Sequence, residues 1–302
     1  MARHLHFDPF SGIAGDMALG ALVHLGVDLK AVDEPLQALG FEPGFHLHAT
    51  AVSRHGIGAI DLKVHTPATP LHQEQAGEKS VHQGEHAHEH SHSHSHSHAH
   101  GEHSHSHEHS HEHGHSHTHG HSQDHSHGHE HHHRTAKDIL HLIGHLDASE
   151  RVKERARAVT RKLAEAEGRV HGMPAEEVHF HEVGAVDSIV DMLGVALALE
   201  ALGVETMSCG PLPLSRGYVR CAHGLMPVPA PATAYLMEGL PTVGVDRTGE
   251  LVTPTGAAIV AALCSSFGPT PAMTVVGVGY GAGDREDPKV PNLLRAYLGE
   301  TA

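Results

Sequence analysis

The sequence predicts a mixed α/β fold of the α+β class, in which a mixed sheet carries packed helices and a disordered histidine-rich insertion interrupts the domain. Composition divides the 302-residue chain, because residues 73–133 consist almost entirely of His, Ser, Glu, Gly and Gln and contain no aromatic residue. Outside this insertion, strand and helix periodicities follow one another irregularly. They include a hairpin, which a purely parallel, doubly wound sheet lacks.

The first part of the core domain is expected over residues 1–72. Three short segments alternate polar and apolar side chains, the pattern of half-buried strands, and two of them flank a four-residue turn. One apolar segment follows a glycine-rich turn and ends at a glycine, which favours a helix. The predicted elements are a strand at 4–7, a helix at 17–25 and a hairpin of strands 45–52 and 57–65.

The insertion holds 25 of the 39 histidines of the chain, between His82 and His133. Such a segment cannot bury enough apolar surface to offset its ordering entropy, so we expect it to be disordered. Neutral imidazole is the commonest side-chain ligand of transition metals, and many equivalent sites imply high capacity with little selectivity. The alternative is a passive low-complexity spacer.

The remainder of the core domain is expected over residues 134–302. Apolar side chains recur there at spacings of three and four, with helix capping signals. Residues 147–150 resemble a capping box before the longest of these helices. The predicted helices are 135–146, 150–170, 188–202 and 256–267, and the predicted strands are 177–183, 204–208, 218–221 and 274–279.

Charge and cysteine content exclude several classes of protein. The net charge is −16 and no basic patch stands out, so nucleic acid is not expected as a partner. The three cysteines include no CxxC pair, which fits a reducing, cytoplasmic compartment. The sequence shows neither a secretory signal nor a run of about 18 apolar residues, so no membrane segment is expected.

The segment from Val178 to Asp191 is the first candidate metal site. On a strand, His179 and His181 would project to one face, and on the following helix Asp187 and Asp191 would share a face. Asp191 lies in a helix that is apolar nearly all round, where a carboxylate is costly unless it is paired, protonated or bound to a metal. Two imidazoles with these carboxylates suit Ni²⁺, Zn²⁺ or Mg²⁺. Helix capping and a buried structural histidine are the alternative.

The glycine-rich turn DPFSGIAGD is a candidate anion site. A turn between a strand and a helix offers backbone N–H groups to an anion, and Ser11, Gly12 and Gly15 fit phosphate contact. Asp8 and Asp16 could bind a metal or act as bases. The P-loop pattern is absent, and a purely structural turn is the alternative.

Two shorter motifs are weaker candidates. Cys221 and His223 have the spacing of a chelate for a soft metal. Thr255 and Gly256, at a predicted helix start, offer a second anion cradle. Structural turns are the alternative for both motifs.

At these same residues the sequence resembles the LarC family of nickel insertion proteins, which complete the nickel-pincer cofactor of lactate racemase. The resemblance runs from about residue 4 to Glu300. It is carried by the stretches FDPFSGIAGDMALGAL, VHFHEVGAVDSIVDMLG, GPLPLSRGYVRCAHGLMPVPAPAT, GELVTPTGAA and GYGAGDREDPKVPNLLR.

The resemblance implies CTP-dependent insertion of Ni²⁺ into pyridinium-3,5-bisthiocarboxylic acid mononucleotide. This cyclometallation forms two nickel–sulfur bonds and one nickel–carbon bond, so it needs a metal site, a base for a ring C–H proton and a phosphate cradle. The roles that we assign are metal binding by His179, His181, Asp187, Asp191, Cys221 and His223; proton transfer by Glu182, Asp16 or Asp8; and phosphate contact by Ser11, Gly12, Gly15, Thr255 and Gly256.

The resemblance also implies partners. Family members commonly continue into a C-terminal domain associated with CTP, whereas this chain ends at Ala302. We therefore expect CTP, with Mg²⁺ or Mn²⁺, to bind a separate domain or polypeptide. A lactate racemase-type apoenzyme would receive the product, and we expect a homo-oligomer. The alternative functions are a non-enzymatic nickel or zinc store or metallochaperone, and a nucleotide hydrolase built on the glycine-rich turn.

Overall fold

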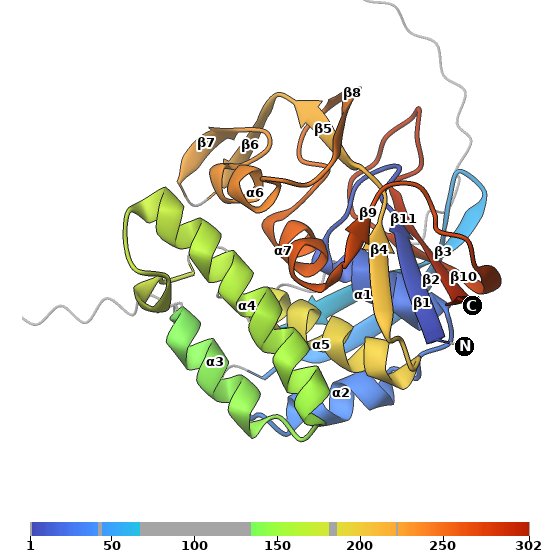
Figure 1. Cartoon of the computed structure of the whole chain (residues 1–302). Helices are drawn as coiled ribbons and strands as arrows, with labels where there is room; N and C mark the ends of the chain where they lie inside the picture. The colour runs from blue at the N-terminus through green and yellow to red at the C-terminus, as the bar shows by residue number, and fades with distance from the viewer. Residues whose placement is uncertain (1, 42–43, 67–133, 181–185, 222, 302) are drawn as a thin grey trace, which may run out of the picture. The chain divides into compact units, whose positions relative to one another are not determined.

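The computed structural model describes residues 2–41, 44–66, 134–180, 186–221 and 223–301 (Figure 1). The predicted disordered insertion 73–133 lies outside these residues, as do His181 and Glu182. The described residues confirm a mixed α/β fold with a mixed sheet and packed helices. None of the described helices combines the length and the apolar character that a membrane span requires.

The N-terminal elements follow the predicted order, with one addition. The hairpin turns at His55 and Gly56, both of which have positive φ. The additional helix, α2, has Pro35 in its interior and buries only Val32 and Leu36, so its sequence carries little helical signal. The elements are β1 (Ala2–Asp8), α1 (Gly15–His24), α2 (Lys30–Gln37), β2 (His46–Arg54) and β3 (Ile57–His65).

The C-terminal elements include every predicted helix. They begin with α3 (Ala136–His145), α4 (Glu150–His171), the 3-10 helix η1 (Ala175–Glu177), α5 (Val186–Ala201) and β4 (Thr206–Cys209). They continue with β5 (Leu212–Arg216), β6 (Tyr218–Cys221), β7 (Gly224–Pro227), α6 (Pro231–Leu236) and β8 (Thr242–Thr248). The last elements are α7 (Pro254–Leu263), β9 (Ser266–Phe267), β10 (Thr274–Ala282) and β11 (Leu293–Thr301).

Two sequence predictions were wrong in their local geometry. The described part of the predicted strand 177–183 is not a strand, because Glu177 ends a 3-10 helix and His179 makes only an isolated bridge to Thr135. The helix cap predicted at 147–150 is Ser149, whose hydroxyl accepts the backbone N–H of Val152 at 3.3 Å. The Thr–Asp capping box instead begins α3 at Thr135.

The large sheet has seven strands in the order β2-β3-β10-β11-β1-β4-β9. Strand β1 pairs antiparallel with β11 and parallel with β4, so the first and last strands of the chain lie side by side (Figure 1). Strand β3 pairs parallel with β10, with Ile60 opposite Gly281 and Asp61 opposite Ala282. The sheet therefore joins the segments before and after the histidine-rich insertion.

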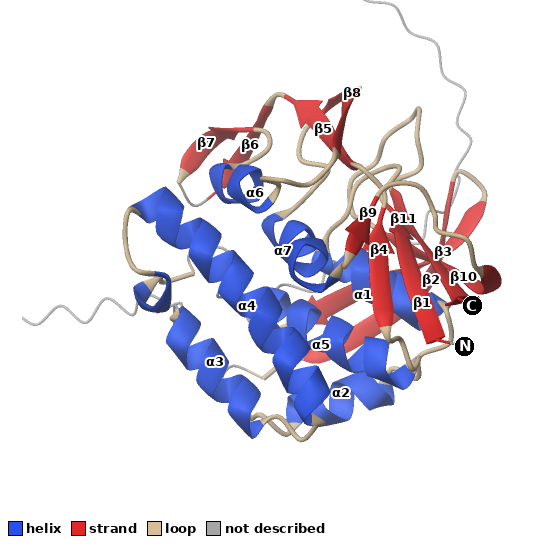
Figure 2. Ribbon diagram, in the orientation of Figure 1, coloured by secondary structure: helices blue, strands red, loops and turns tan. Residues whose placement is uncertain are grey.

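The helices stack outward from one side of this sheet (Figure 2). Helix α1 packs on β3, β10 and β11; α5 packs on α1; and α4 packs on α5, α6 and α7. The approach of α1 to β10 requires glycine, because a Cβ at Gly281 would lie 1.8 Å from the backbone oxygen of Met17. Helix α5 lies inside this stack and buries nearly every side chain, including Asp191.

Candidate functional site

Two carboxyl groups meet where α1 crosses α5. Asp16 is in the first turn of α1, and its backbone N–H favours the ionised form of the Asp191 carboxyl group of α5 and so lowers its pKa. The helices come this close because Gly15 has no side chain: a Cβ there would lie 2.7 Å from both Cβ and Oδ2 of Asp191. The side chain of Asp191 is therefore fixed beside the start of α1.

The environment of this pair raises the pKa of both carboxyl groups. Burial, followed by the neighbouring charges of Asp16 and Asp187, raises the pKa of Asp191 well above its ordinary value. Burial raises the pKa of Asp16 to about 6, against the opposing charge of Lys63. Asp191 Oδ1 is buried and accepts no hydrogen bond from the residues that the structure describes. The pair is thus suited to exchange a proton near neutral pH or to bind a cation.

Lys63 links this pair to two further carboxylates. Its ammonium group lies 3.7 Å from Asp16 Oδ2 and 3.0 Å from Asp61 Oδ1, and it also pairs with Asp284. Asp61 and Lys63 are two residues apart on β3, so their side chains leave the same face of the sheet. Sequence analysis did not predict a role for these three residues, because charged side chains on a hairpin, such as Asp61 and Lys63, or in a loop, such as Asp284, usually face solvent.

The glycine-rich turn interlocks with the start of α7. Ile13 pairs with this segment through two hydrogen bonds, from its own N–H to Leu251 O at 2.9 Å and from the Thr253 N–H to its carbonyl at 3.1 Å. Gly12 has φ of 121°, and a Cβ there would lie 2.0 Å from Leu251 O. A Cβ at Gly256 would lie 2.4 Å from Ile13 O. Tertiary packing therefore brings the two predicted anion motifs together at neighbouring helix starts.

Part of the predicted phosphate-binding set makes contacts within the protein. The Gly256 N–H donates to the Thr253 hydroxyl at 3.2 Å, and the Thr253 and Thr255 hydroxyls lie 3.0 Å apart. Ser11 is fully buried and its hydroxyl accepts a hydrogen bond from an arginine. A role in phosphate contact for these residues, Gly12 and Gly15 stays a prediction.

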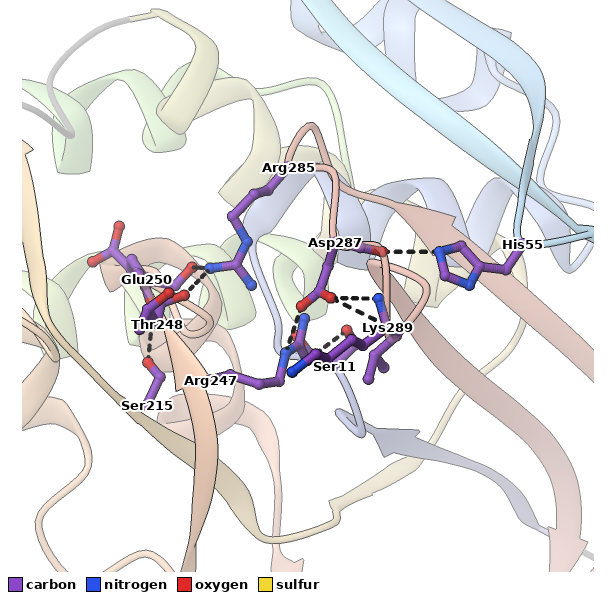
Figure 3. Close-up of polar contacts among 11 residues, drawn as sticks. Ser11, His55, Ser215, Arg247, Thr248, Glu250, Arg285, Asp287 and Lys289 are labelled. Carbon is purple, nitrogen blue, oxygen red and sulfur yellow. Dashed lines mark hydrogen bonds and ion pairs between the residues drawn. The ribbon is translucent and has the colours of Figure 1, made fainter.

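That arginine is Arg247, which fastens the loop of residues 283–291 to the glycine-rich turn (Figure 3). Its Nη1 donates to Ser11 Oγ at 2.9 Å and its Nε donates to Asp287 Oδ2 at 3.0 Å. The other oxygen of Asp287 accepts the N–H of Lys289 at 2.9 Å, and the backbone oxygen of Asp287 lies 2.8 Å from His55 Nε2. The charged run DREDPK in this loop is the sequence signal that could have revealed the contact.

The other predicted residues lie apart from the carboxyl pair. Asp8 pairs with Arg295 on the neighbouring strand, with Nε donating at 3.0 Å. His179 is exposed beside the charge of Asp138 at the start of α3. Asp187 is exposed on α5 and acts electrostatically on Asp191.

Cys221 and His223 lie on the β6–β7 hairpin. The ring of His223 lies with its centre 5.0 Å from that of His171, at the end of α4. Among the residues that the structure describes, no three or more His, Cys, Asp or Glu side chains form a group that could hold a metal ion. The predicted metal ligands, together with His181 and Glu182 outside the described residues, stay predictions.

Fold and site together define a mixed α/β protein in which a buried carboxyl group, that of Asp191, and a partly buried one, that of Asp16, lie near the starts of two helices. A family model described as nickel insertion protein matches residues 5–302. The chain belongs to this family of nickel insertion proteins. This agrees with the resemblance carried by its sequence motifs.

Individual relatives support the same assignment. A putative nickel insertion protein of Citrifermentans bemidjiense is 42% identical over 297 residues, which is 98% of this chain and 61% of the relative. A Geobacillus kaustophilus protein named pyridinium-3,5-bisthiocarboxylic acid mononucleotide nickel insertion protein is 39% identical, over 98% of this chain and 59% of the relative. The chain thus spans about three fifths of the length of these relatives. No solved structure matches it.

Proposed function

We propose that this chain carries the nickel-inserting site for pyridinium-3,5-bisthiocarboxylic acid mononucleotide, the substrate in the name of the Geobacillus relative. The reaction is a cyclometallation that supplies the nickel-pincer cofactor of a lactate racemase-type enzyme. CTP, with Mg²⁺ or Mn²⁺, would bind a separate domain or polypeptide. Nickel is the substrate metal here.

The observation that carries this proposal is the close approach of the carboxyl groups of Asp16 and Asp191 at the crossing of α1 and α5. Forming the nickel–carbon bond requires that a ring C–H bond breaks and that its proton leaves to a base. A base works best when its pKa lies near the operating pH, and the pKa of Asp16, about 6, leaves it mostly ionised at pH 7 and still basic. Asp16 also keeps about a quarter of its side chain exposed, so a substrate can reach it. Glu182 is the alternative base.

Asp191 is the proposed anchor for nickel on the protein. Its Oδ1 is buried with no hydrogen-bond donor among the described residues, so it offers a lone pair to a cation. Bound Ni²⁺ would offset the cost of ionising this buried carboxyl group. In this proposal Asp187, whose charge acts on Asp191, is a further ligand, and His179, His181 and the pair of Cys221 and His223 stay predicted metal ligands outside this group.

The test is direct detection of product. The chain is incubated with Ni²⁺, CTP, Mg²⁺ and the bisthiocarboxylated mononucleotide, with and without the C-terminal part of a longer relative, and the nickelated product is measured by mass spectrometry. We expect product in the presence of that part, and a rate at least tenfold lower for Asp191→Asn. Full activity of Asp191→Asn would remove the carboxyl pair from the mechanism.

A second candidate function is nickel or zinc storage, and the 25 histidines between His82 and His133 favour it. Deletion of residues 73–133 separates the two functions. If the chain is an insertion enzyme, the deletion lowers the number of bound Ni²⁺ ions but retains product formation at excess Ni²⁺. Loss of all insertion at excess Ni²⁺ would contradict a reservoir role for the histidines.

A further inference from the structure

Arg247 has a nitrogen for which the protein provides no acceptor. Its side chain is only 12% exposed, and its Nε and Nη1 are engaged by Asp287 and Ser11. The remaining nitrogen, Nη2, is buried and has no hydrogen-bond partner among the described residues. A buried donor on a charged group is costly to leave unpaired, so this position is suited to an acceptor from outside the protein.

A second guanidinium group approaches the same place from the loop of residues 283–291. Figure 3 shows Arg285 above Arg247, with its Nη1 donating to the backbone oxygen of Thr248 at 2.8 Å. Burial lowers the pKa of Arg285, and the positive charge of Arg247 lowers it further, so the two cations are close enough to repel each other. Gly249 leaves room for Arg285 beside Thr248, because a Cβ at Gly249 would lie 2.9 Å from Arg285 Nη1.

Asp287 pairs with Arg247 and also acts on Arg285 through its charge, so this one carboxylate faces two guanidinium groups. The two arginines lie beside Ser11, in the turn that leads into α1 and contacts the start of α7. Helix starts carry partial positive charge, so the protein concentrates positive potential at this end of the site.

We propose that Arg247 and Arg285 form the subsite for the phosphate ester of the ligand, with Arg247 Nη2 donating to a phosphate oxygen. Planar guanidinium groups match phosphate geometry and stay charged at all working pH values. This inference rests on the proposed function for the identity of the ligand, a pyridinium mononucleotide. It separates the site into a phosphate end at these arginines and a reacting end at Asp16 and Asp191.

The phosphate could come from the mononucleotide or from a nucleoside triphosphate, so the test compares both. Calorimetry with the whole chain measures binding of nicotinic acid mononucleotide, of nicotinic acid riboside, which lacks the phosphate, and of CTP. We expect the mononucleotide to bind at least tenfold more tightly than the riboside. Equal affinity for these two ligands would overturn the proposal, and so would arginine-dependent binding confined to CTP.

The variants Arg285→Gln and Arg247→Lys assign the effect to the two arginines. Arg285→Gln should weaken mononucleotide binding about 10- to 100-fold and leave riboside binding unchanged, as for loss of a charged hydrogen bond. Arg247→Lys retains the charge but not the fork, and we expect a smaller loss. The matched control is Arg216→Gln, since Arg216 pairs with Asp246 on the exposed surface. Unchanged phosphate preference in Arg285→Gln would refute the assignment even if Arg247→Lys does not fold.

These measurements are independent of nickel chemistry. If the chain prefers the mononucleotide through its arginines but inserts no nickel, the phosphate subsite stands and the proposed function fails. If nickel insertion proceeds with the same KM in Arg285→Gln, the proposed function stands and the subsite fails.

Discussion

The substitution Asp16→Asn should stabilise the protein at neutral pH and remove its insertion activity. A carboxyl group whose pKa is raised by folding resists ionisation in the native state. Between the ordinary pKa of 3.8 and the native pKa of about 6, the unfolded chain loses this proton while the native protein keeps it. The free energy of unfolding therefore falls as the pH rises through this window, and the loss is complete above pH 6.

The pKa shift of Asp16 sets the size of the expected stabilisation. A pKa difference of about two units corresponds to about 3 kcal/mol, which an uncharged asparagine would recover at pH 7. The native pKa of about 6 already includes the attraction of Lys63, 3.7 Å away, so the loss of this ion pair is not subtracted again. The amide oxygen can still accept the N–H of Met17, as Asp16 Oδ1 does at 2.7 Å. We expect a net gain of about 3 kcal/mol at pH 7.

Urea denaturation at several pH values between 4 and 8 measures this effect. The difference between Asp16→Asn and wild type should grow from near zero at pH 4 to its full value above pH 6. Asp147→Asn is the matched control, because Asp147 is exposed, and its curve should follow wild type. A constant difference across this range, or a destabilised Asp16→Asn at pH 7, would refute the reasoning.

Three further substitutions test the packing of the fold. Gly281→Ala should destabilise the protein by more than about 3 kcal/mol or prevent folding, since its Cβ would lie 1.8 Å from a backbone oxygen of α1. Gly144→Ala is the contrast: its Cβ would meet open space on α3, so it should stabilise the protein by up to about 1 kcal/mol. Thermal melts of both variants check this difference. Ser208→Ala should cost about 3 kcal/mol in urea denaturation, because the Ser208 hydroxyl bonds His4 Nε2 at 2.7 Å and His6 Nδ1 at 2.8 Å and both buried imidazoles would lose a partner. A cost below about 0.5 kcal/mol would show that these imidazoles find other partners.

Much of the fold could be predicted from local patterns. The hairpin, α3 and α4 have strong periodicity, α1 and α5 are strongly apolar segments, and each of these elements lies within a few residues of its predicted range. Strands β5, β7, β8, β9 and β11 and the short helices α2 and α6 were missed. Their sequences are short, rich in proline or glycine, or nearly continuous in apolar residues. They therefore show neither the two-residue alternation of a strand nor the three- and four-residue spacing of a helix. Strand β11 pairs with β1 across almost the whole chain, a contact that no local pattern encodes.

The sequence predicted which types of residue form the candidate site better than it predicted which of these residues lie together. The cost of burying Asp191 follows from its apolar helix, and its side chain is 9% exposed. The sequence grouped it with its neighbour His179, whereas the structure records its interaction with Asp16, 175 positions earlier. Lys63, Arg247 and Arg285 were missed, because charged side chains on strands and loops usually face solvent.

The sequence by itself determined the elements with clear periodicity, the buried carboxyl group of α5 and the family to which the motifs belong. These depend on neighbours along the chain, whose spacing is fixed by covalent geometry. Tertiary structure alone decided that Asp16 faces Asp191, that Lys63 joins them, and that Arg247 ties the 283–291 loop to Ser11. These contacts depend on the close approach of α1 to α5, to the start of α7 and to the sheet, which Gly15, Gly256 and Gly281 make sterically possible.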